Sequence, residues 1–222
     1  MEIRHLDVVI PCHNYGRYLA DAIESALAQI AFEVRVIVVD DASTDNTAEV
    51  VAGFDDASVV ALRVDQPSGA ANARNIGTSR SDSDFLAFLD ADDLWPPERS
   101  SILAELLSGT DSLPCGVVEE FSVNDSGEIV PAGFVRSGTS LGAMLMRRET
   151  FERIGLFDTS FSLGENIDWL SRARQLGVEL VTTDAVTLRR RVHGGNTTTR
   201  SAPDRSDYLK VIRAHRARLE GS

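Results

Sequence analysis

Apolar runs and helical spacing alternate along the first hundred residues of the chain. Short apolar runs that stop at polar or turn-forming residues are typical of buried strands, and they predict strands over residues 6–10, 34–39, 59–64 and 85–89. Helical spacing and capping residues predict helices after residue 16, after residue 45 and over residues 69–77. Strands that alternate with helices in this way indicate an α/β fold with a mostly parallel sheet and right-handed crossovers.

The second half of the chain has a different pattern. It predicts a helix up to about residue 107, a hairpin of residues 117–123 and 128–131, and a helix of residues 165–176 that ends at Gly177. Further short strands are predicted over residues 143–146, 178–182 and 186–191, and a basic amphipathic helix over residues 204–218. Because no linker interrupts the chain, we expect one domain of residues 1–200 and a helical tail of residues 201–222.

Three carboxylates follow the apolar run at residues 85–89: Asp90, Asp92 and Asp93. If the strand continued, Asp90 and Asp92 would point the same way, because side chains alternate along a strand. Carboxylates this close repel one another unless a cation lies between them. A divalent ion with oxygen ligands, shared with substrate phosphates, is the natural candidate. In the alternative interpretation Asp90 ends the strand, and Asp92 or Asp93 caps the helix entered at Pro96.

Polar residues follow two other predicted strands at the corresponding point. Residues 11–14 follow the first strand, and Asp40 and Asp41 end the second. In open parallel sheets, ligands bind beyond the carboxyl ends of the strands. We therefore expect these residues and residues 90–93, here called the acidic strand end, to surround one binding site.

Composition narrows the classes of function. The chain has 222 residues and a formal net charge of −12, which suits one large domain and argues against a nucleic-acid backbone as the main partner. No apolar run is long enough to span a membrane, and the N-terminus lacks the features of a signal peptide, so a cytoplasmic protein is expected. Cys12 and Cys115 have no metal-ligand spacing and are expected to remain reduced thiols.

Four segments, in this order and spacing, resemble the nucleotide-binding half of family 2 glycosyltransferases with the GT-A fold: VVIPCHNYGRYL, VIVVDDASTDNT, GAANARNIG and FLAFLDADDLWPP. Two later segments, SGTSLGAMLMRRETFERIGLFD and GENIDWLSRARQLG, resemble the acceptor side of the family. The resemblance implies one GT-A (Rossmann-like) α/β domain, with a mostly parallel central sheet, helices on both faces and a small antiparallel acceptor-side portion. The nucleotide-binding half would be residues 1–97, and the acceptor-side half residues 98–200.

The resemblance also implies a donor site. Asp92, in the DXD motif of the family, would bind a divalent metal, Mn²⁺ or Mg²⁺, and Asp90 would lie near the ribose or a metal-bound water. Asp41 would accept a hydrogen bond from the nucleobase, with Pro11 and Asn14 lining the same pocket. The alternative for Asp41 and its neighbour is capping of the following helix.

Basic residues are expected near the same donor site. Arg74, on the small-residue helix, would supply positive charge or order the loop that holds the nucleotide; the alternative is a solvated surface charge. His193 follows a predicted strand and precedes two glycines. A lone His is more often a surface or hydrogen-bonded residue than a ligand, but in GT-A enzymes a His near the end of the domain often completes the metal shell. His193 is therefore the second candidate ligand. Alternation lets only some of the arginines at 189–191 face the diphosphate.

The acceptor side departs from the family pattern at GENIDW. Inverting members carry Glu-Asp here, and the Asp removes the acceptor proton, whereas this chain has Glu165 and Asn166, and an amide cannot act as a general base. Glu165 and Asp168 share a helix face, so Glu165 is the first candidate base and Asp168 the second. Alternatively, both only charge the helix start. Gly-Glu-Asn also resembles the retaining polypeptide N-acetylgalactosaminyltransferases, so retention stays open beside inversion.

We therefore expect a metal-dependent glycosyltransferase that moves a sugar from a nucleotide-sugar donor, a UDP-sugar by the resemblance, to a glycan, lipid-linked or peptide acceptor, with inversion as the default. One alternative is a sugar nucleotidyltransferase, although PCHNYGRYL is not the Gly-rich basic loop of that class. The other is a non-catalytic nucleotide-sugar or glycan-binding module. The tail helix could make peripheral contact with an acidic membrane surface, but its narrow apolar face favours packing on the domain.

Overall fold

The computed structural model describes residues 4–54, 57–107, 111–124, 126–137, 140–161 and 163–194. The predicted tail helix of residues 204–218 lies outside these residues. None of the described helices is long and apolar enough to cross a membrane.

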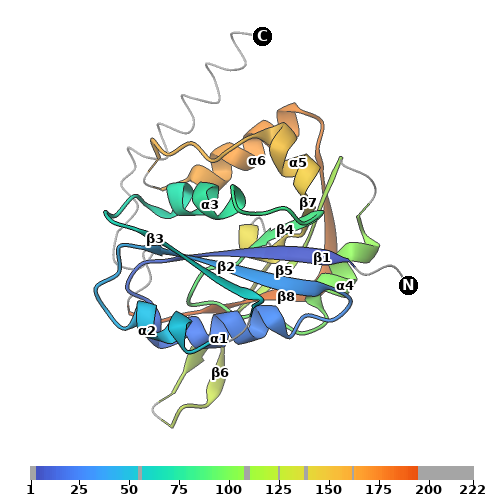
Figure 1. Ribbon diagram of the computed structural model, residues 1–222. Coiled ribbons are helices and arrows are strands. Elements are labelled where there is room, and N and C mark those ends of the chain that lie inside the picture. Colours follow the sequence, from blue (N-terminus) through green and yellow to red (C-terminus); the bar gives the residue numbers. More distant parts are fainter. Residues whose placement is uncertain are drawn as a thin grey trace.

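Among the described residues the central sheet has five strands in the order β3-β2-β1-β4-β7 (Figure 1). Four of them run parallel: β1 (His5–Cys12), β2 (Glu33–Asp41), β3 (Val59–Val64) and β4 (Phe85–Phe88). The fifth, β7 (Met146–Arg147), is antiparallel to β4. The α/β fold with a mostly parallel sheet, expected from the alternating pattern, is confirmed.

Side-chain alternation divides the apolar residues of these strands between two cores. Leu6, Val8 and Ile10 of β1 pack on one side with α1 (Gly16–Leu27) and α2 (Thr47–Ala52). On the other side, Val9 packs with three helices, α3 (Ala70–Thr78), α5 (Arg148–Ile154) and α6 (Glu165–Gln175). Figure 1 shows the two groups of helices on opposite faces of the sheet.

The small residues of α3 allow it to approach the sheet closely. Ala71, Ala73 and Gly77 are buried against it, and a Cβ added at Gly77 would lie 2.3 Å from Cγ1 of Val9. The sequence left open whether this helix approaches a ligand or the sheet. Its small residues face the sheet, and its one buried arginine, Arg74, reaches the acidic strand end.

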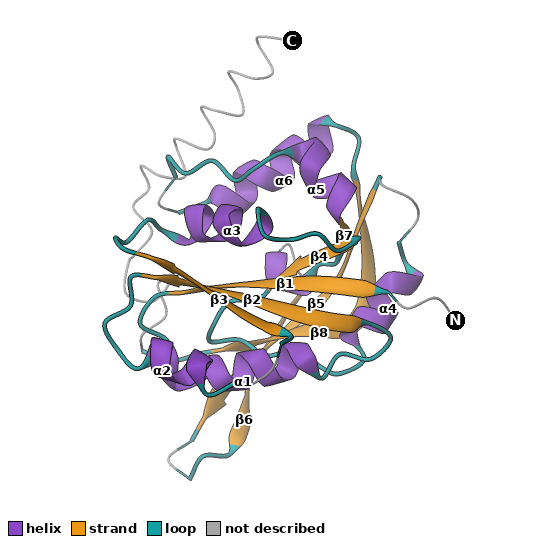
Figure 2. Cartoon of the chain, in the orientation of Figure 1, coloured by secondary structure: helices purple, strands orange, loops and turns teal. Residues whose placement is uncertain are grey.

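A second, smaller sheet has the order β6-β5-β8 among the described residues (Figure 2). β6 (Ile129–Ser137) is antiparallel to β5 (Ser112–Val123), whereas β8 (Glu179–Arg191) runs parallel to β5. The two predicted strands at 178–182 and 186–191 are thus one strand, because pairing with β5 continues across irregularities near Cys115 and Val117. The helix α4 (Arg99–Glu105) ends earlier than the predicted residue 107.

Three local predictions were wrong. Residues 143–146 are not a strand: a 3-10 turn, η1 (Leu141–Ala143), precedes the two residues of β7. The helix α5 was missed, because seven residues are too few for a period to show. The helix α2 begins at Thr47 with Asn46 as its N-cap, later than the capping residues suggested. Asp45 instead accepts backbone hydrogen bonds from Thr47 and Gly16, which joins the starts of α1 and α2.

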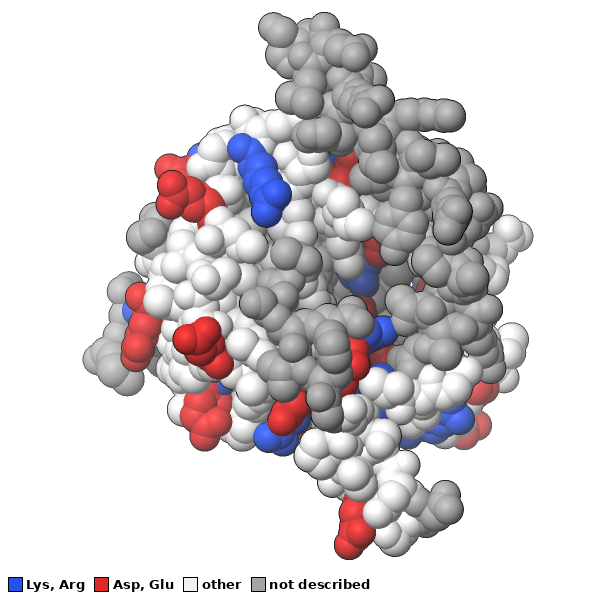
Figure 3. Space-filling model, turned by 180° about the vertical axis from the view of Figure 1, so that it is seen from behind, with Lys and Arg blue, Asp and Glu red and all other residues white. Residues whose placement is uncertain are grey.

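Both cysteines are buried and unpaired. Burial raises the pKa of each thiol to about 11, so both remain protonated. On the face seen in Figure 3, acidic and basic side chains of the described residues lie next to one another in several places. Such exposed pairs contribute little to stability.

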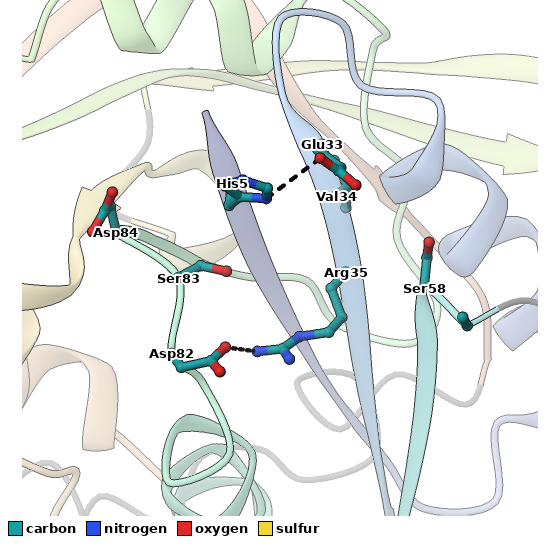
Figure 4. A pocket seen from close by; sticks show the side chains of 9 residues that line it. His5, Glu33, Val34, Arg35, Ser58, Asp82, Ser83 and Asp84 are labelled. Atoms are coloured by element: carbon teal, nitrogen blue, oxygen red, sulfur yellow. Dashed lines mark hydrogen bonds and ion pairs between the residues drawn. The ribbon is translucent and has the colours of Figure 1, made fainter. Parts of the chain in front are cut away.

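A hollow of about 470 Å³ lies at the amino ends of the parallel strands (Figure 4). Its lining includes His5, Glu33, Arg35, Asp82 and Asp84. Because ligands of parallel sheets bind at the opposite, carboxyl ends, this hollow is separate from the expected site.

The fully buried Asp7 anchors this amino-terminal edge. Its carboxylate accepts two hydrogen bonds of 2.8 Å from Arg35 and one of 3.1 Å from each backbone amide of Asp82 and Ser83. Burial alone would raise the pKa of Asp7, but the hydrogen bonds, foremost that of Arg35, outweigh it and hold the pKa below its ordinary value of 3.8.

We predict that Asp7→Asn lowers the free energy of unfolding by about 3 kcal/mol, because it breaks a buried charged pair. The pKa of Asp7 is lower in the folded chain than the 3.8 of the unfolded chain, so its carboxylate stabilises the fold at pH values above 3.8. This contribution is lost as the pH falls below 3.8 and through the lower pKa of the folded state. Urea denaturation at pH 7 and at pH 3 should therefore show a gap between wild type and variant that narrows in acid. Asp82→Asn, at the exposed partner of the same Arg35, should cost less than about 1 kcal/mol. An equal loss from both substitutions would contradict this.

Candidate active site

The acidic strand end is a turn rather than a continuation of β4. The strand ends at Phe88, and the amide of Asp93 donates a 3.0 Å hydrogen bond to the carbonyl of Asp90. The chain is not extended here, so strand alternation does not apply to Asp90 and Asp92. Each of the three carboxylates has a different partner.

Asp90 shares a buried guanidinium with Glu165. Nη2 of Arg74 lies 2.8 Å from Oδ1 of Asp90, and Nη1 lies 2.8 Å from Oε1 of Glu165. Arg74 is therefore not a solvated surface charge. It connects Asp90, which follows β4, with Glu165 at the start of α6. Glu165 is 91 residues from Arg74 along the chain.

Asp92 and His193 are brought together from positions 101 residues apart. Nε2 of His193 lies 3.0 Å from Oδ2 of Asp92, and both side chains are largely buried. The imidazole also packs on α1, where its centroid is 4.8 Å from the ring of Tyr18 and 5.8 Å from that of Tyr15. The two residues expected to bind a metal thus face each other.

Asp93 faces the protein interior. Its Oδ1 accepts a 2.9 Å hydrogen bond from the amide of Arg191, and the neighbouring Leu94 exchanges two backbone hydrogen bonds with Arg189. Neither Asp92 nor Asp93 caps α4, which begins at Arg99 without a side-chain cap.

The site carries an excess of negative charge. Burial raises the pKa of Asp92, the charge of Asp90 adds to this, and His193 partly opposes it. Burial, together with the charges of Asp90 and Asp92, raises the pKa of Asp93 well above its ordinary range. A cation placed at this edge would therefore be stabilised.

The predicted nucleotide-binding residues lie at the ends of β1 and β2. Pro11 is within β1, and the chain beyond it turns at Asn14, which has a positive φ of 59°. Oδ1 of Asn14 accepts a 2.8 Å hydrogen bond from the amide of Thr44, while Ala42 also has a positive φ, of 57°. Left-handed backbone at non-glycine residues is uncommon and clusters at functional sites.

The carboxylate of Asp41 is hydrogen-bonded to the loop before α3. Its two carboxylate oxygens accept hydrogen bonds from the amides of Ser68 and Gly69 and from the hydroxyl of Ser68, at 2.7–3.0 Å. The single N–H of Ser68 contacts both oxygens, so three donor hydrogens face four lone-pair sites, and the carboxylate can accept one further hydrogen bond. Its role in binding the base stays a prediction.

The two candidate bases have different surroundings. Glu165 is the first residue of α6 and faces Arg74 at the acidic strand end. Asp168 is fully buried, and its Oδ2 lies 3.0 Å from Nε of Arg172 in the same helix. Oδ1 of Asn166 is buried without a hydrogen-bond partner among the described residues.

Of the arginines at 189–191, Arg189 and Arg190 pair with Glu119 and Glu120 of β5. Arg191 turns inward, where its guanidinium donates to the carbonyl of Asp92. Sequence reasoning did not find the contacts of Tyr18 and Arg191 with this site. The only sequence signal for Arg191 was the alternation of side chains along β8. Among the described residues no group of three or more His, Cys, Asp and Glu side chains is arranged to hold a metal ion.

Comparison with known proteins identifies the class. The model of the family "Glycosyl transferase family 2" matches residues 7–155, more than half of the chain. The chain therefore belongs to glycosyl transferase family 2. This membership supports the glycosyltransferase interpretation over the sugar nucleotidyltransferase.

Two relatives show the extent of the likeness. An uncharacterized glycosyltransferase of Nostoc sp. is 31% identical over 125 residues, which are 55% of this chain and 38% of the relative. The UDP-Glc:alpha-D-GlcNAc-diphosphoundecaprenol beta-1,3-glucosyltransferase WfaP of Escherichia coli is 25% identical over 93% of this chain and 86% of its own length. The chain thus matches well under half of the first relative.

Solved structures confirm the GT-A fold. TarS of S. aureus in complex with UDP-GlcNAc superposes with a TM-score of 0.75 at 19% identity, over 95% of this chain and 65% of TarS 1-349. GalNAc-T7 with UDP, GalNAc and Mn²⁺ superposes with a TM-score of 0.76 at 18% identity, over 96% of this chain and 48% of the other.

We predict that Arg74→Met lowers the free energy of unfolding by about 2 kcal/mol, because it leaves the largely buried Glu165 without its cation, while the half-exposed Asp90 is partly screened by solvent. Arg74→Lys should recover only part of the loss, because an ammonium cannot span two carboxylates as a guanidinium does. Arg80→Met, at an exposed arginine two residues beyond the same helix, is the matched control. Chemical denaturation measures all three, and similar losses for Arg74→Met and Arg80→Met would refute the assignment.

Proposed function

We propose that the protein transfers a sugar from a UDP-sugar to a glycan, lipid-linked or peptide acceptor, with inversion and with a divalent metal ion bound by Asp92 and His193. The observation that carries the proposal is the meeting of these two side chains, 3.0 Å apart, at the carboxyl edge of the parallel sheet. The catalytic domain is residues 1–200, with a donor half of 1–97 and an acceptor half of 98–200.

The residues present fit a metal ion. Asp92 offers a carboxylate oxygen and His193 an imidazole nitrogen. Burial, and after it the charge of Asp90, raise the pKa of Asp92, and a cation would favour its ionised form. Two protein ligands suit an ion whose other positions are filled by substrate phosphates and water. An imidazole in the pair favours Mn²⁺ over Mg²⁺, whose ligands are mostly oxygen. Bound there, the ion would supply Lewis-acid stabilisation to the leaving diphosphate.

The donor side is assigned to the strand ends. Pro11 and Asn14 would line the base pocket, Asp41 would contact the base, and Asp90 would lie near the ribose. Support comes from the position of all four at one sheet edge and from the left-handed backbone at Asn14. Arg74 would hold Asp90 in place and contribute positive charge.

Glu165 is the proposed general base. It lies beside the acidic strand end through Arg74, whereas Asp168 is fully buried in an ion pair with Arg172. One oxygen of Glu165 accepts from Arg74, and the other would receive the proton of the acceptor hydroxyl. Asp168 would instead hold α6 to the segment after α5, since Arg172 also donates to the carbonyls of Ile154 and Leu156.

The relatives support one of the three acceptor classes. The Escherichia coli relative, which matches most of this chain, is named for a lipid-linked diphosphate acceptor. A lipid-linked sugar is therefore the first acceptor to test. The tail of residues 201–222 supplies a basic segment that could contact an acidic membrane surface.

We predict that UDP binds in the presence of Mn²⁺ and that EDTA abolishes binding. GDP and dTDP should bind at least tenfold more weakly. Asp92→Asn and His193→Ala should each weaken Mn²⁺-dependent UDP binding by about tenfold or more, because each removes a ligand. Isothermal titration calorimetry measures these affinities.

Asp84→Asn is the matched control. Asp84 is exposed and precedes the amino end of β4, the end opposite Asp92, so this variant should bind UDP like wild type. Equal binding of UDP by wild type and Asp92→Asn would refute the metal assignment. A preference for another nucleotide would change the donor, and binding of none of the three would remove the donor site.

We predict that Glu165→Gln lowers kcat by about 10²–10⁴-fold while UDP affinity changes less than threefold, because it removes the proton acceptor but keeps an amide oxygen that can accept from Arg74. Turnover is measured with UDP-glucose and an α-GlcNAc-diphosphate lipid, and proton NMR of the product reports its anomeric configuration. Asp168→Asn should act through a lower melting temperature, with a smaller effect on kcat. Full activity of Glu165→Gln would exclude this base, and a retained configuration would exclude inversion.

A further inference from the structure

Arg191 joins four parts of the chain behind the proposed metal site. Its side chain is 6% exposed. Nε donates to the carbonyl of Asp92 at 3.0 Å, and Nη2 lies 2.9 Å from Oδ2 of Asp21 in α1. The guanidinium carbon lies 4.8 Å from the ring centroid of Tyr18 and 4.9 Å from that of Phe121 in β5. One side chain thus contacts the acidic strand end, α1 and β5 from the end of β8.

The backbone of Arg191 is held by Asp93. This carboxylate is buried and accepts the amide of Arg191 at 2.9 Å. Leu94 and Arg189 exchange backbone hydrogen bonds of 2.9 and 2.8 Å immediately beside this contact. The third carboxylate of the acidic strand end is therefore directed at the backbone of β8.

His193 depends on this arrangement for its position. It lies two residues after Arg191, beyond the end of β8. Between them, the amide of Val192 donates to the carbonyl of Phe121 at 2.7 Å. Tyr18 contacts both the Arg191 guanidinium and the His193 ring, at 4.8 Å each. The direction of the imidazole toward Asp92 is thus set by residues that are not themselves in the ligand pair.

We propose that Arg191 and Asp93 are positioning residues that lock the end of β8 to the acidic strand end and so present His193 to Asp92. This inference rests on the proposed function, because it concerns the same metal and donor site. Arg191 acts as a two-pronged donor, to the Asp92 carbonyl and to Asp21, which a lysine cannot reproduce. Asp93 acts as a hydrogen-bond acceptor and not as a metal ligand.

Two measurements test the proposal. Hydrogen-exchange mass spectrometry of residues 187–194 measures how firmly the end of β8 is held to the acidic strand end, and it needs no metal or nucleotide. Calorimetry of UDP with Mn²⁺ reports its effect on the site. The variants are Arg191→Met, Arg191→Lys, Asp93→Asn and Asp93→Ala. Arg189→Met is the matched control, since Arg189 lies on the same strand with a 47% exposed side chain that pairs with Glu119.

We predict that Arg191→Met and Asp93→Ala increase exchange in residues 187–194 and weaken Mn²⁺-dependent UDP binding by about tenfold or more, as expected when support of a metal ligand is lost. Arg191→Lys should fall between wild type and Arg191→Met. Asp93→Asn keeps an acceptor oxygen and should bind within threefold of wild type, unlike Asp92→Asn. Arg189→Met should match wild type in both measurements.

Each other result has a definite meaning. If Asp93→Asn loses binding as Asp92→Asn does, Asp93 is a ligand and the inference is wrong. If exchange rises in Arg191→Met while UDP binding is unchanged, the lock does not position the site. Should wild type bind no nucleotide while exchange still rises in Arg191→Met, the proposed function fails but the lock itself stands. If Arg191→Met does not fold, the comparison of Asp93→Ala with Asp93→Asn decides.

Discussion

Mutual repulsion among three carboxylates within four residues is the constraint on which this site depends. The fold meets it with groups from distant segments: a guanidinium from α3 on Asp90, an imidazole beyond β8 on Asp92, and a backbone amide of β8 on Asp93. Because these contacts are partly or fully buried, the low local dielectric strengthens both the repulsion and its compensation. The closeness of α3 to the sheet and the path of β8 are what bring the compensating groups within reach.

The compensation is unequal, and this inequality has a chemical consequence. Asp90 has a permanently charged partner that it shares with Glu165, Asp93 has a backbone amide, and Asp92 has a histidine that is charged only when protonated. The remaining negative charge is concentrated around Asp92, where burial and Asp90 raise the pKa. A divalent cation would balance this charge better than a single ammonium or guanidinium group, because it carries two positive charges, and a bound diphosphate would add further negative charge to the site.

Arg74 also joins the two halves of the domain. It lies on α3, in the proposed donor half, and contacts Glu165 in the first turn of α6, in the proposed acceptor half. Because one buried guanidinium contacts both carboxylates, a displacement of Asp90 would be transmitted to Glu165. The departure of this chain from its family, Asn166 in place of an acidic residue, falls directly after this junction.

The sequence by itself determined the elements with strong local signals. Buried strands, the helices between them and the polar residues at the strand ends follow from apolar runs and from side-chain periodicity, which are local properties. Short elements could not be predicted: α5 has seven residues, and the predicted strand at 143–146 begins at the end of η1 and reaches only the first residue of β7. The sequence predicted that one strand ends at residue 182 and another begins at residue 186, whereas β8 is continuous. Its pairing with β5 continues across a register shift, and such a shift depends on the partner strand and cannot be predicted from one strand alone.

The partners of the site residues were decided only by the tertiary structure. The residues Asp92, His193 and Arg74 could be named from sequence motifs, but not their contacts, because hydrogen bonds between positions 101 residues apart depend on strand order and helix packing. For the same reason Asp41 was found bound to Ser68 and Gly69, and Asp93 directed at β8. A carboxylate is visible in a sequence, whereas the group that neutralises it is a property of the folded chain.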